Sequence, residues 1–169
     1  MKYFELFDIP IQLSVNTKTL SDKFFSLSKK YHPDFYARDS VNNQAMALEK
    51  SSQINKAWHT FQNPDATIKY VLIEKGLMEE EEKYELPPDF LMEVMDVNEQ
   101  LMDADDSTTA PKILATINQL QDEIYSPVSK IVENYQDDTV SQEELLQVKE
   151  YYYKKKYLDR IRRQLKGMA

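Results

Sequence analysis

Several residue types that build common functional sites are missing or scarce in this sequence. The 169 residues include no cysteine, two histidines and two glycines. Without cysteine the chain cannot form a disulfide, a thiolate zinc site or a thiolate-held iron–sulfur cluster, and it has no cysteine nucleophile. Two histidines are too few for most all-histidine metal sites. We therefore expect no cofactor and no metal site, and the function must rest on other side chains.

Long apolar runs are also absent. No stretch approaches about 18 consecutive apolar residues, so we expect no helix that spans a membrane. The first residues, Met1 to Leu6, carry an acid within a short apolar stretch and show no cleavage-site pattern, which argues against a secretory signal. The cytoplasm is the expected location. The formal net charge of −8 argues against nucleic acid as a partner, because the phosphate backbone attracts basic surfaces.

The charged residues that are present are unevenly distributed. Residues 79–106 hold twelve acids and one base, whereas residues 149–166 hold eight bases and two acids. One interpretation is that the two segments pack antiparallel and neutralise each other. The other is that each leaves part of its charge for a partner. The sequence leaves both interpretations open.

The composition favours helix at almost every position. Glycine is rare, Glu, Lys, Leu and Gln are abundant, and 41% of the residues are hydrophobic, enough for a core. In the first half we expect helices at residues 3–7, 17–31, 41–62 and 66–75. The second and third of these form a helical hairpin around a short polar loop. Gly76 suits the C-terminal cap of the fourth.

The second half begins after a pair of prolines, Pro87 and Pro88, which interrupt helix. Beyond them we expect helices at 89–105, at 110–136 with a kink at Pro127, and at 141–166, where Ser141 and Glu144 form a capping box. Short connections favour an antiparallel three-helix bundle. The sequence thus predicts an all-α fold with domains at 1–76 and 89–169 and a linker at 77–88.

The tripeptide His32-Pro33-Asp34 lies at the tip of the predicted hairpin. By itself it also suits a plain turn, because proline fixes φ and aspartate bonds its own backbone. Its surroundings resemble a J domain: a basic helix ending in Lys29-Lys30-Tyr31 precedes it, and Ile54-Asn55-Lys56-Ala57-Trp58 and Asn63-Pro64 follow.

The resemblance to J domains implies a partner and a mechanism. In that family the His-Pro-Asp loop docks on a DnaK-type chaperone and triggers its ATP hydrolysis. Carried over, His32, Pro33 and Asp34 would be the trigger. The lysines that would attract an acidic surface of the chaperone are Lys23, Lys29 and Lys30.

The helix expected at 89–105 carries two apolar stripes. At about 100° per residue, one compact stripe contains Phe90, Val94, Val97 and Leu101. A second stripe beside it contains Leu91, Met95 and Met102, edged by Met92 and Glu99. One stripe is enough to pack a surface helix. Either the bundle buries both stripes, or the second stays exposed as a Met-rich contact surface.

The sequence Phe90-Leu91-Met92-Glu93 with the acids after it resembles the motif by which HscB-type co-chaperones hold an IscU-type iron–sulfur scaffold protein. A basic–aromatic–Leu-Asp stretch on the last helix completes that surface in the family, and here it reads Lys156-Tyr157-Leu158-Asp159. The resemblance implies these scaffold-binding residues: Leu91, Met92, Met95, Asp96, Glu99, Lys156 and Tyr157.

Taken together, these features predict an adaptor and not an enzyme. We expect a co-chaperone that binds an IscU-type scaffold, delivers it to a DnaK-type chaperone (HscA), and exists as a monomer or weak dimer. The alternative is a J-domain adaptor that delivers a different client, favoured if the second apolar stripe is buried. A carboxylate-based hydrolase is disfavoured, because the acids of 79–106 are spread over a helix surface and do not converge.

Overall fold

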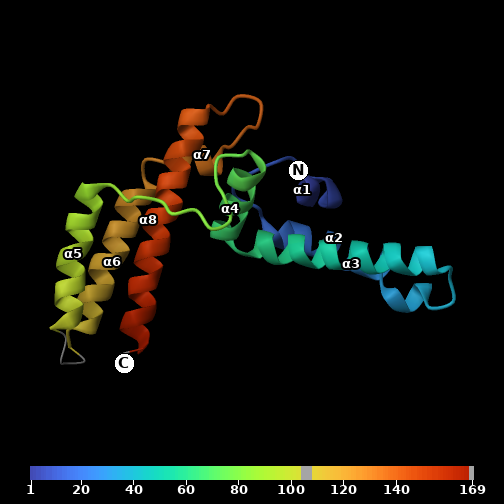
Figure 1. Ribbon diagram of the computed structural model, residues 1–169, viewed down its shortest axis with the longest axis horizontal. Coiled ribbons are helices and arrows are strands. Elements are labelled where there is room, and N and C mark those ends of the chain that lie inside the picture. Colours follow the sequence, from blue (N-terminus) through green and yellow to red (C-terminus); the bar gives the residue numbers. More distant parts are fainter. Residues whose placement is uncertain (104–107, 168–169) are drawn as a thin grey trace. The chain divides into compact units, whose positions relative to one another are not determined.

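The computed structural model describes residues 1–103 and 108–167, and the chain forms two compact units (Figure 1). The first unit holds Met1–Gly76 together with Tyr135–Thr139, and the second holds Leu77–Asn134 and Val140–Ala169. Every regular element in the described part of the chain is a helix, which confirms the expected all-α fold. Among the helices of these residues, none has the length and hydropathy needed to cross a membrane.

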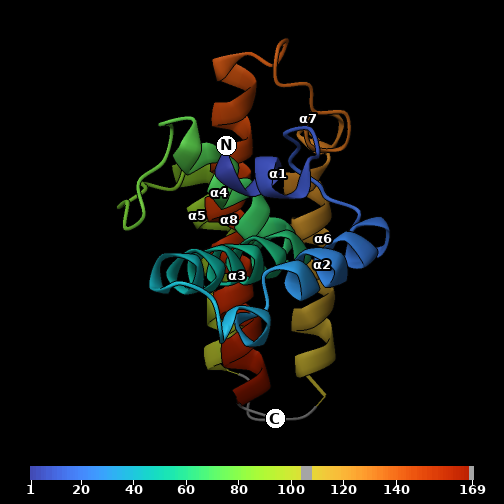
Figure 2. The same cartoon turned by 90° about the vertical axis from the view of Figure 1, so that its right-hand side faces the viewer.

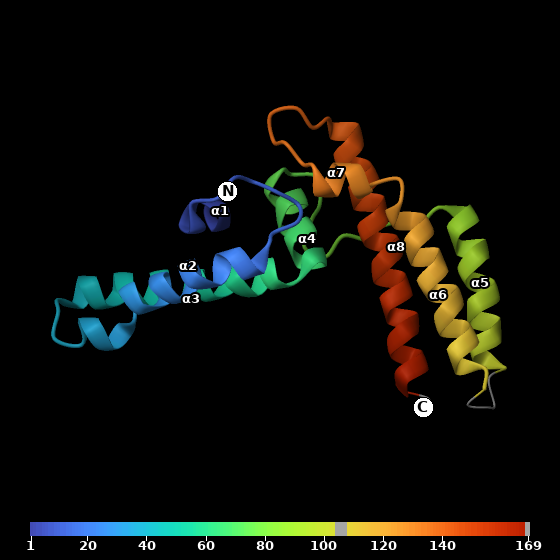
Figure 3. The ribbon, with the colours of Figure 1, turned by 180° about the vertical axis from the view of Figure 1, so that it is seen from behind.

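The first unit is built around a helical hairpin. Its elements are α1 (Lys2–Phe7), α2 (Thr17–Lys30), the short 3-10 helix η1 (Pro33–Tyr36), α3 (Val41–Gln62) and α4 (Pro64–Glu74). Helices α2 and α3 lie side by side, and η1 occupies the loop that joins them (Figure 3). Figure 2 looks onto this loop. The predicted hairpin is confirmed.

Aromatic rings fasten the helices of the first unit. Phe4 and Phe7 of α1 contact Phe61 of α3 with ring-centre distances of 5.1 and 5.5 Å. Trp58 of α3 stacks on Phe24 of α2 at 4.7 Å. Such rings bury a large area and pack in preferred geometries, so they stabilise the hairpin from its inner side.

The end of α4 and a distant segment complete the first unit. Gly76 has a φ of 70°, a left-handed conformation that glycine adopts without steric cost, as expected for a helix cap. In the segment Tyr135–Thr139, the carboxylate of Asp137 pairs with the Lys75 ammonium at 2.5 Å and accepts a hydrogen bond from the Tyr135 hydroxyl at 2.6 Å. The Lys75 hydrogen bond, and then that of Tyr135, hold the pKa of Asp137 below its ordinary value.

The second unit is a helical bundle. Its helices are α5 (Pro88–Met102), α6 (Ala110–Tyr125), α7 (Ser129–Glu133) and α8 (Gln142–Gly167). Helices α5, α6 and α8 lie side by side and alternate in direction, which confirms the antiparallel three-helix bundle (Figures 1 and 3). Their shared core consists of Phe90, Val94, Val97, Leu101, Ile113, Ile117, Leu120, Leu158, Ile161 and Leu165.

The start of α8 has the predicted capping box. The Ser141 N–H donates to the Glu144 carboxylate at 2.8 Å, and the Glu144 N–H donates to the Ser141 hydroxyl at 3.1 Å. These two bonds satisfy backbone donors that the first turn of a helix leaves without partners.

The single kinked helix expected at 110–136 is wrong, because the chain forms two separate helices there. α6 ends at Tyr125, and α7 begins only at Ser129. Pro127 has no N–H to donate, so the ladder of helical hydrogen bonds is interrupted at this position, although Ser126 before it keeps a helical conformation. The turn is closed by the Val128 N–H, which donates to the Tyr125 carbonyl at 3.0 Å.

The helix expected at 89–105 ends at Met102 in the structure. Residues 104 and 105 lie outside the described residues. Two of the twelve acids counted in the sequence, Asp105 and Asp106, lie outside them as well.

The segment predicted as a linker, residues 77–88, is not helical before Pro88 and packs along α8. The Lys149 ammonium donates to the Glu82 carboxylate at 2.6 Å, and the Tyr84 ring stacks on Tyr153 at 4.4 Å. The Lys149 bond lowers the pKa of Glu82, and burial raises the pKa of Tyr153 to about 12. The segment therefore forms one wall of the second unit.

Candidate functional site

The His-Pro-Asp loop is folded by a local hydrogen bond of its own histidine. His32 caps η1, and its Nδ1 accepts a hydrogen bond from the Asp34 backbone N–H at 3.3 Å. Pro33 occupies the first helical position, where a missing N–H costs nothing. The side chains of His32 and Asp34 are 54% and 87% exposed. The loop therefore presents an imidazole and a carboxylate to solvent in a fixed local geometry.

Both ends of this loop are tied to the hairpin. At one end the Tyr36 hydroxyl donates to the Lys30 carbonyl at 3.2 Å, which satisfies the end of α2. At the other end the Asp39 carboxylate accepts from the Ser40 N–H at 2.8 Å and from the Asn43 amide at 2.7 Å. The Asn43 hydrogen bond is the larger cause of a lowered pKa of Asp39. A loop held in this way loses little freedom on binding a partner.

The three lysines predicted to attract a chaperone differ in their surroundings. Lys29 and Lys30 are exposed in the last turn of α2. Lys23 is half-buried, and its ammonium lies 3.5 Å from the Asp8 carboxylate. Asp8 offsets part of the Lys23 charge, so Lys29 and Lys30 are the stronger candidates for an electrostatic contact.

An exposed aromatic ring beside the loop is missing from the residues predicted from the sequence. Phe35 directly follows Asp34, and its ring lies edge-on to His32 with a centre distance of 6.2 Å. Phe35 is among the exposed large apolar side chains of the first unit. The position of an apolar residue directly after the polar His-Pro-Asp motif is the sequence signal that could have added Phe35 to the candidate residues.

One apolar stripe of α5 is buried and the other is exposed. Phe90, Val94, Val97 and Leu101 are buried in the bundle core, as expected for the first stripe. Leu91, Met95 and Met102 are 41%, 52% and 84% exposed. Of the two alternatives left open by the sequence, the structure therefore supports the one in which the second stripe stays exposed. Beside it, the side chains of Met92, Asp96 and Glu99 are also exposed.

A hydrogen bond joins the exposed side of α5 to α8. The Asn98 amide donates to the Tyr157 hydroxyl at 3.1 Å, and the Phe90 ring lies edge-on to Tyr157 at 6.2 Å. Tyr157 is half-buried, Lys156 beside it is exposed, and Arg160 lies over the Tyr157 ring at 4.5 Å from its centre. The structure thus brings Tyr157, one of the predicted binding residues, next to α5. Asn98 and Arg160 were not among those residues.

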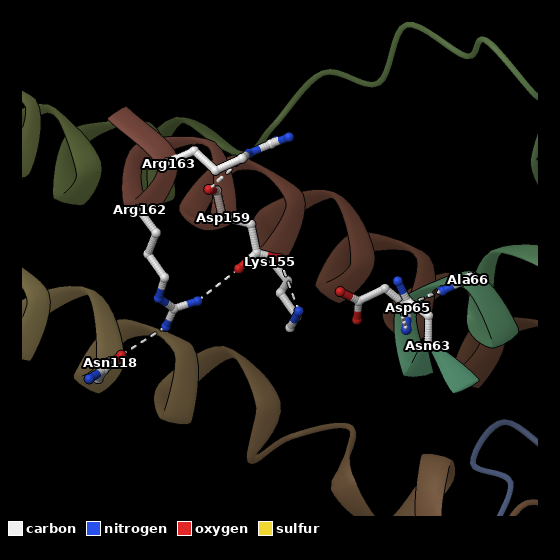
Figure 4. A network of polar contacts seen from close by, with 8 residues as sticks. All are labelled: Asn63, Asp65, Ala66, Asn118, Lys155, Asp159, Arg162 and Arg163. Carbon is white, nitrogen blue, oxygen red and sulfur yellow. Dashed lines mark hydrogen bonds and ion pairs between the residues drawn. The ribbon is translucent and has the colours of Figure 1, made fainter. Parts of the chain in front are cut away.

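The acidic and basic segments neutralise each other in part and also leave charge exposed. Glu82 and Lys149 do pair between the acidic and the basic segment. Within α8, however, Asp159 pairs with Lys155 at 3.0 Å and with Arg162 at 2.8 Å, and Arg162 also donates to Asn118 of α6 (Figure 4). The acids that remain exposed on α5 are Asp89, Glu93, Asp96 and Glu99, and Asp103 is exposed at the C-terminal cap of this helix. Charge is therefore left at the surface of the second unit.

The described residues offer no grouping of metal-binding side chains. Within 1–103 and 108–167, no three His, Cys, Asp or Glu side chains converge in a way that could hold a metal ion. The two surfaces described above present apolar and charged groups suited to contacts with proteins.

Comparison with known proteins gives consistent matches over the whole chain. A family model described as the HSCB C-terminal oligomerisation domain matches residues 86–166. The co-chaperone protein HscB homolog of one Vibrio vulnificus strain is 32% identical over 139 residues, which cover 82% of this chain and 81% of that protein. The homolog of Photobacterium profundum is 29% identical over 169 residues, covering 99% of this chain and 96% of that protein.

Solved structures show the same likeness. Chaperone HscB from Vibrio cholerae superposes with a TM-score of 0.75 at 27% identity, covering 99% of this chain and 97% of that one. Human co-chaperone protein HscB superposes with a TM-score of 0.81 at 27% identity, covering 98% of this chain and 81% of that one. The likeness includes both units and extends beyond the bundle.

Proposed function

This chain belongs to the HscB family of co-chaperones, and on that premise we propose that it carries an IscU-type iron–sulfur scaffold protein to a DnaK-type chaperone of the HscA kind and stimulates the ATPase of that chaperone. In this proposal the chain assists iron–sulfur cluster transfer as an adaptor. Residues 1–76 act as the J domain and residues 89–169 as the scaffold-binding domain.

The exposed second stripe of α5 carries the proposal for the scaffold. Leu91 and Met95 stay in solvent although the same helix buries a complete stripe of its own. Methionine and leucine exposed in this way suit an adaptable contact with another protein. Asp96 and Glu99 on one edge and the Asn98–Tyr157 pair on the other supply polar contacts that orient a bound partner.

The loop between α2 and α3 supports the proposal for the chaperone. His32 and Asp34 are exposed in a fixed local geometry, and Lys29 and Lys30 lie at the end of the preceding helix. A carboxylate held on a rigid loop reaches a cationic partner at low entropic cost, and the lysines accelerate encounter with an acidic surface. Because one chain carries both sites, it raises the concentration of the scaffold near the chaperone.

The test is a pair of titrations with purified partners. We expect the IscU-type scaffold to bind the chain in isothermal titration calorimetry, and a single-turnover assay to show faster ATP hydrolysis by the chaperone when the chain is added. If a pull-down from cell extract retrieves the chaperone together with a different client, that client and not the scaffold is the cargo of this chain. Absence of ATPase stimulation would refute the role of the first unit.

A further inference from the structure

Two aromatic rings of the first unit are exposed to solvent. Phe25 on α2 is 66% exposed, and Phe35 on η1 is 68% exposed. In residues 1–103 and 108–167, every other aromatic side chain is buried or partly buried. Single exposed apolar side chains are common on protein surfaces, so the argument depends on where these two rings lie.

The two rings lie along one line of the surface that also contains the His-Pro-Asp loop. On α2, Phe25 and Lys29 are four residues apart, and His32 follows three residues later, which places all three on one side of the helix. The His32 N–H donates to the Lys29 carbonyl at 3.4 Å, so the last turn continues the helix up to the loop. Phe35 extends the line, with its ring edge-on to His32 at a centre distance of 6.2 Å. We call these four residues the docking stripe.

Both rings are held in place before any partner binds. The Phe25 ring tilts against Phe24 at a centre distance of 5.6 Å, and Phe24 stacks on Trp58 of α3 at 4.7 Å. Phe35 is held through its backbone N–H, which donates to the His32 carbonyl at 3.1 Å. A ring that is already oriented loses little freedom on binding, so more of the gain from burying it appears as affinity.

The charges around the rings indicate the chemistry of a partner surface. Lys29 lies between the two rings, and Lys18 lies seven residues before Phe25 on the same face of α2. The acids near this line are Asp22 on α2 and Asp34 in the loop. A partner that fits therefore has an acidic group for Lys29, a cationic group for Asp34, and one apolar patch for each ring.

We propose that Phe25 and Phe35 are apolar anchors by which a DnaK-type chaperone holds the docking stripe, and that they select a chaperone with two apolar patches beside its acidic contact. The proposal rests on the proposed function, which assigns the chaperone contact to His32, Asp34 and the lysines. The docking stripe is continuous with that contact, because it contains both His32 and Lys29. Lysines attract many acidic surfaces, whereas a ring placed against a charged group of the wrong partner leaves that group buried and unpaired.

The rings and the lysines act on different steps of binding. Exposed charges mainly change the association rate, and their effect fades as salt screens them. Apolar anchors that lose water on binding mainly change the dissociation rate. Loss of a ring should therefore shorten the lifetime of the complex at low and at high salt alike.

Surface plasmon resonance with the purified DnaK-type chaperone and ATP tests the anchors. Phe25→Ala and Phe35→Ala should each weaken binding at least about tenfold, and the double variant about a hundredfold, through faster dissociation. Melting temperatures measured by circular dichroism should stay near that of the parent. If loss of the Phe24 contact destabilises Phe25→Ala, Phe35→Ala still decides, because the Phe35 ring contacts the exposed His32.

Leu48→Ala is the matched control. Leu48 is 62% exposed on α3, outside the docking stripe, and its truncation should leave binding unchanged within about twofold. Phe25→Leu keeps an apolar side chain and should retain most of the affinity, whereas Phe25→Lys adds positive charge and should lose it. If Phe25→Lys binds as tightly as the parent, charge alone explains the contact and the proposal is wrong. Unchanged dissociation rates in the alanine variants, or equal weakening by Leu48→Ala, also overturn it.

Single-turnover ATPase assays with two purified DnaK-type chaperones, one of the HscA kind and one that serves unfolded proteins, test the selection. The parent should stimulate one of them at least about tenfold more strongly at equal concentration. Phe25→Ala with Phe35→Ala should narrow that ratio. Equal stimulation of both by the parent, or a ratio that the double variant leaves unchanged, overturns the selection. A parent that stimulates neither chaperone refutes the proposed function, whereas ring variants that match a stimulating parent refute the anchors alone.

Discussion

The two units of this protein place their candidate functional residues in contrasting ways. In the first unit, His32 and Asp34 lie on a loop outside the core, and short-range hydrogen bonds hold them. In the second unit, Leu91 and Met95 lie on α5, a helix whose other side fills the bundle core. A loop of the first kind can be altered without touching a buried side chain. On α5, a residue proposed to bind a partner can be the direct sequence neighbour of a residue that the core needs.

The difference determines how substitutions in each unit should be interpreted. In the first unit, loss of activity with an unchanged melting temperature is the expected result for any residue of the loop. In the second, neighbouring positions of α5 give opposite results, because Val94 is buried and Met95 is exposed. The comparison fails if the exposed stripe proves necessary for folding, or if the loop does.

The sharpest test is Leu91→Ser with Met95→Ser. Central apolar contacts at an interface commonly cost about 2 kcal/mol or more each when truncated, so the pair should weaken scaffold binding roughly a thousandfold. The melting temperature should stay near that of the parent, since neither side chain is in the core. Isothermal titration with the scaffold and thermal unfolding by circular dichroism measure the two effects.

Two controls bracket this variant. Leu114→Ser alters an apolar side chain on α6 that is as exposed as Leu91, and scaffold binding should not change. Val94→Ser places a hydroxyl in the core and should lower the melting temperature, at a cost of about 2 kcal/mol or more. If the Leu91/Met95 double variant melts at as low a temperature as Val94→Ser, then the second stripe contributes to folding as the buried stripe does, and the comparison is wrong.

The corresponding test in the first unit is His32→Gln. We expect the fold to persist and ATPase stimulation of the DnaK-type chaperone to be lost, because the His32 side chain is 54% exposed and lies outside the core. A single-turnover ATPase assay measures the effect. His59→Gln, which alters an exposed histidine on α3, should stimulate normally. Normal stimulation by His32→Gln would remove the loop from the proposed mechanism.

A weaker effect is expected for Lys29→Glu with Lys30→Glu. Exposed charges mainly steer association and are screened within about 10 Å at 0.1 M salt. Affinity for the chaperone should therefore fall by about tenfold at low ionic strength and by less at high salt. Titrations at several salt concentrations measure this, with Lys112→Glu plus Lys130→Glu as the charge-matched control. Equal affinity of the parent at all salt concentrations would contradict a steering role.

The smallest effect concerns a feature that the two units share. Asp137 in the first unit and Glu82 in the second are each held by a lysine and a tyrosine, and both have a lowered pKa. A carboxylate whose pKa is lower in the folded state stabilises that state at pH values above its ordinary pKa, which is 3.8 for Asp137 and 4.5 for Glu82, and the contribution is lost as the pH falls through the folded pKa.

Asp137→Asn should therefore reduce the free energy of unfolding at pH 7 by at most about 1 kcal/mol, since the pair is partly exposed. Parent and variant should converge as the pH is lowered below 3.8. Thermal unfolding between pH 7 and pH 3 measures the difference. Asp138→Asn, a change at the exposed neighbour, should match the parent throughout.

Features that depend on residues close together in the sequence were predictable from it. The stripe of Phe90, Val94 and Val97 follows from the helical repeat, which assigns each residue to a face without knowledge of its neighbours in space. Ser141 and Glu144 cap α8 through bonds to their own turn. For the same reason, the hairpin and its His-Pro-Asp loop could be located before the structure was known.

Contacts between residues far apart in the chain were not predictable. No repeat connects Asp137 with Lys75, or Asn98 with Tyr157, although each pair has a hydrogen bond or an ion pair. Pro127 marks a disturbance of the helix, but only packing decides whether the helix bends or stops.

The sulfur atoms of α5 make the exposed side of this helix sensitive to oxidation. Met92, Met95 and Met102 are open to solvent, whereas Met78 is buried and shielded. Peroxide converts an accessible thioether into a polar, chiral sulfoxide, which reductases reverse. Oxidation of α5 therefore removes the apolar character of the proposed scaffold surface while the core of the bundle stays intact, and repair restores it without new protein synthesis.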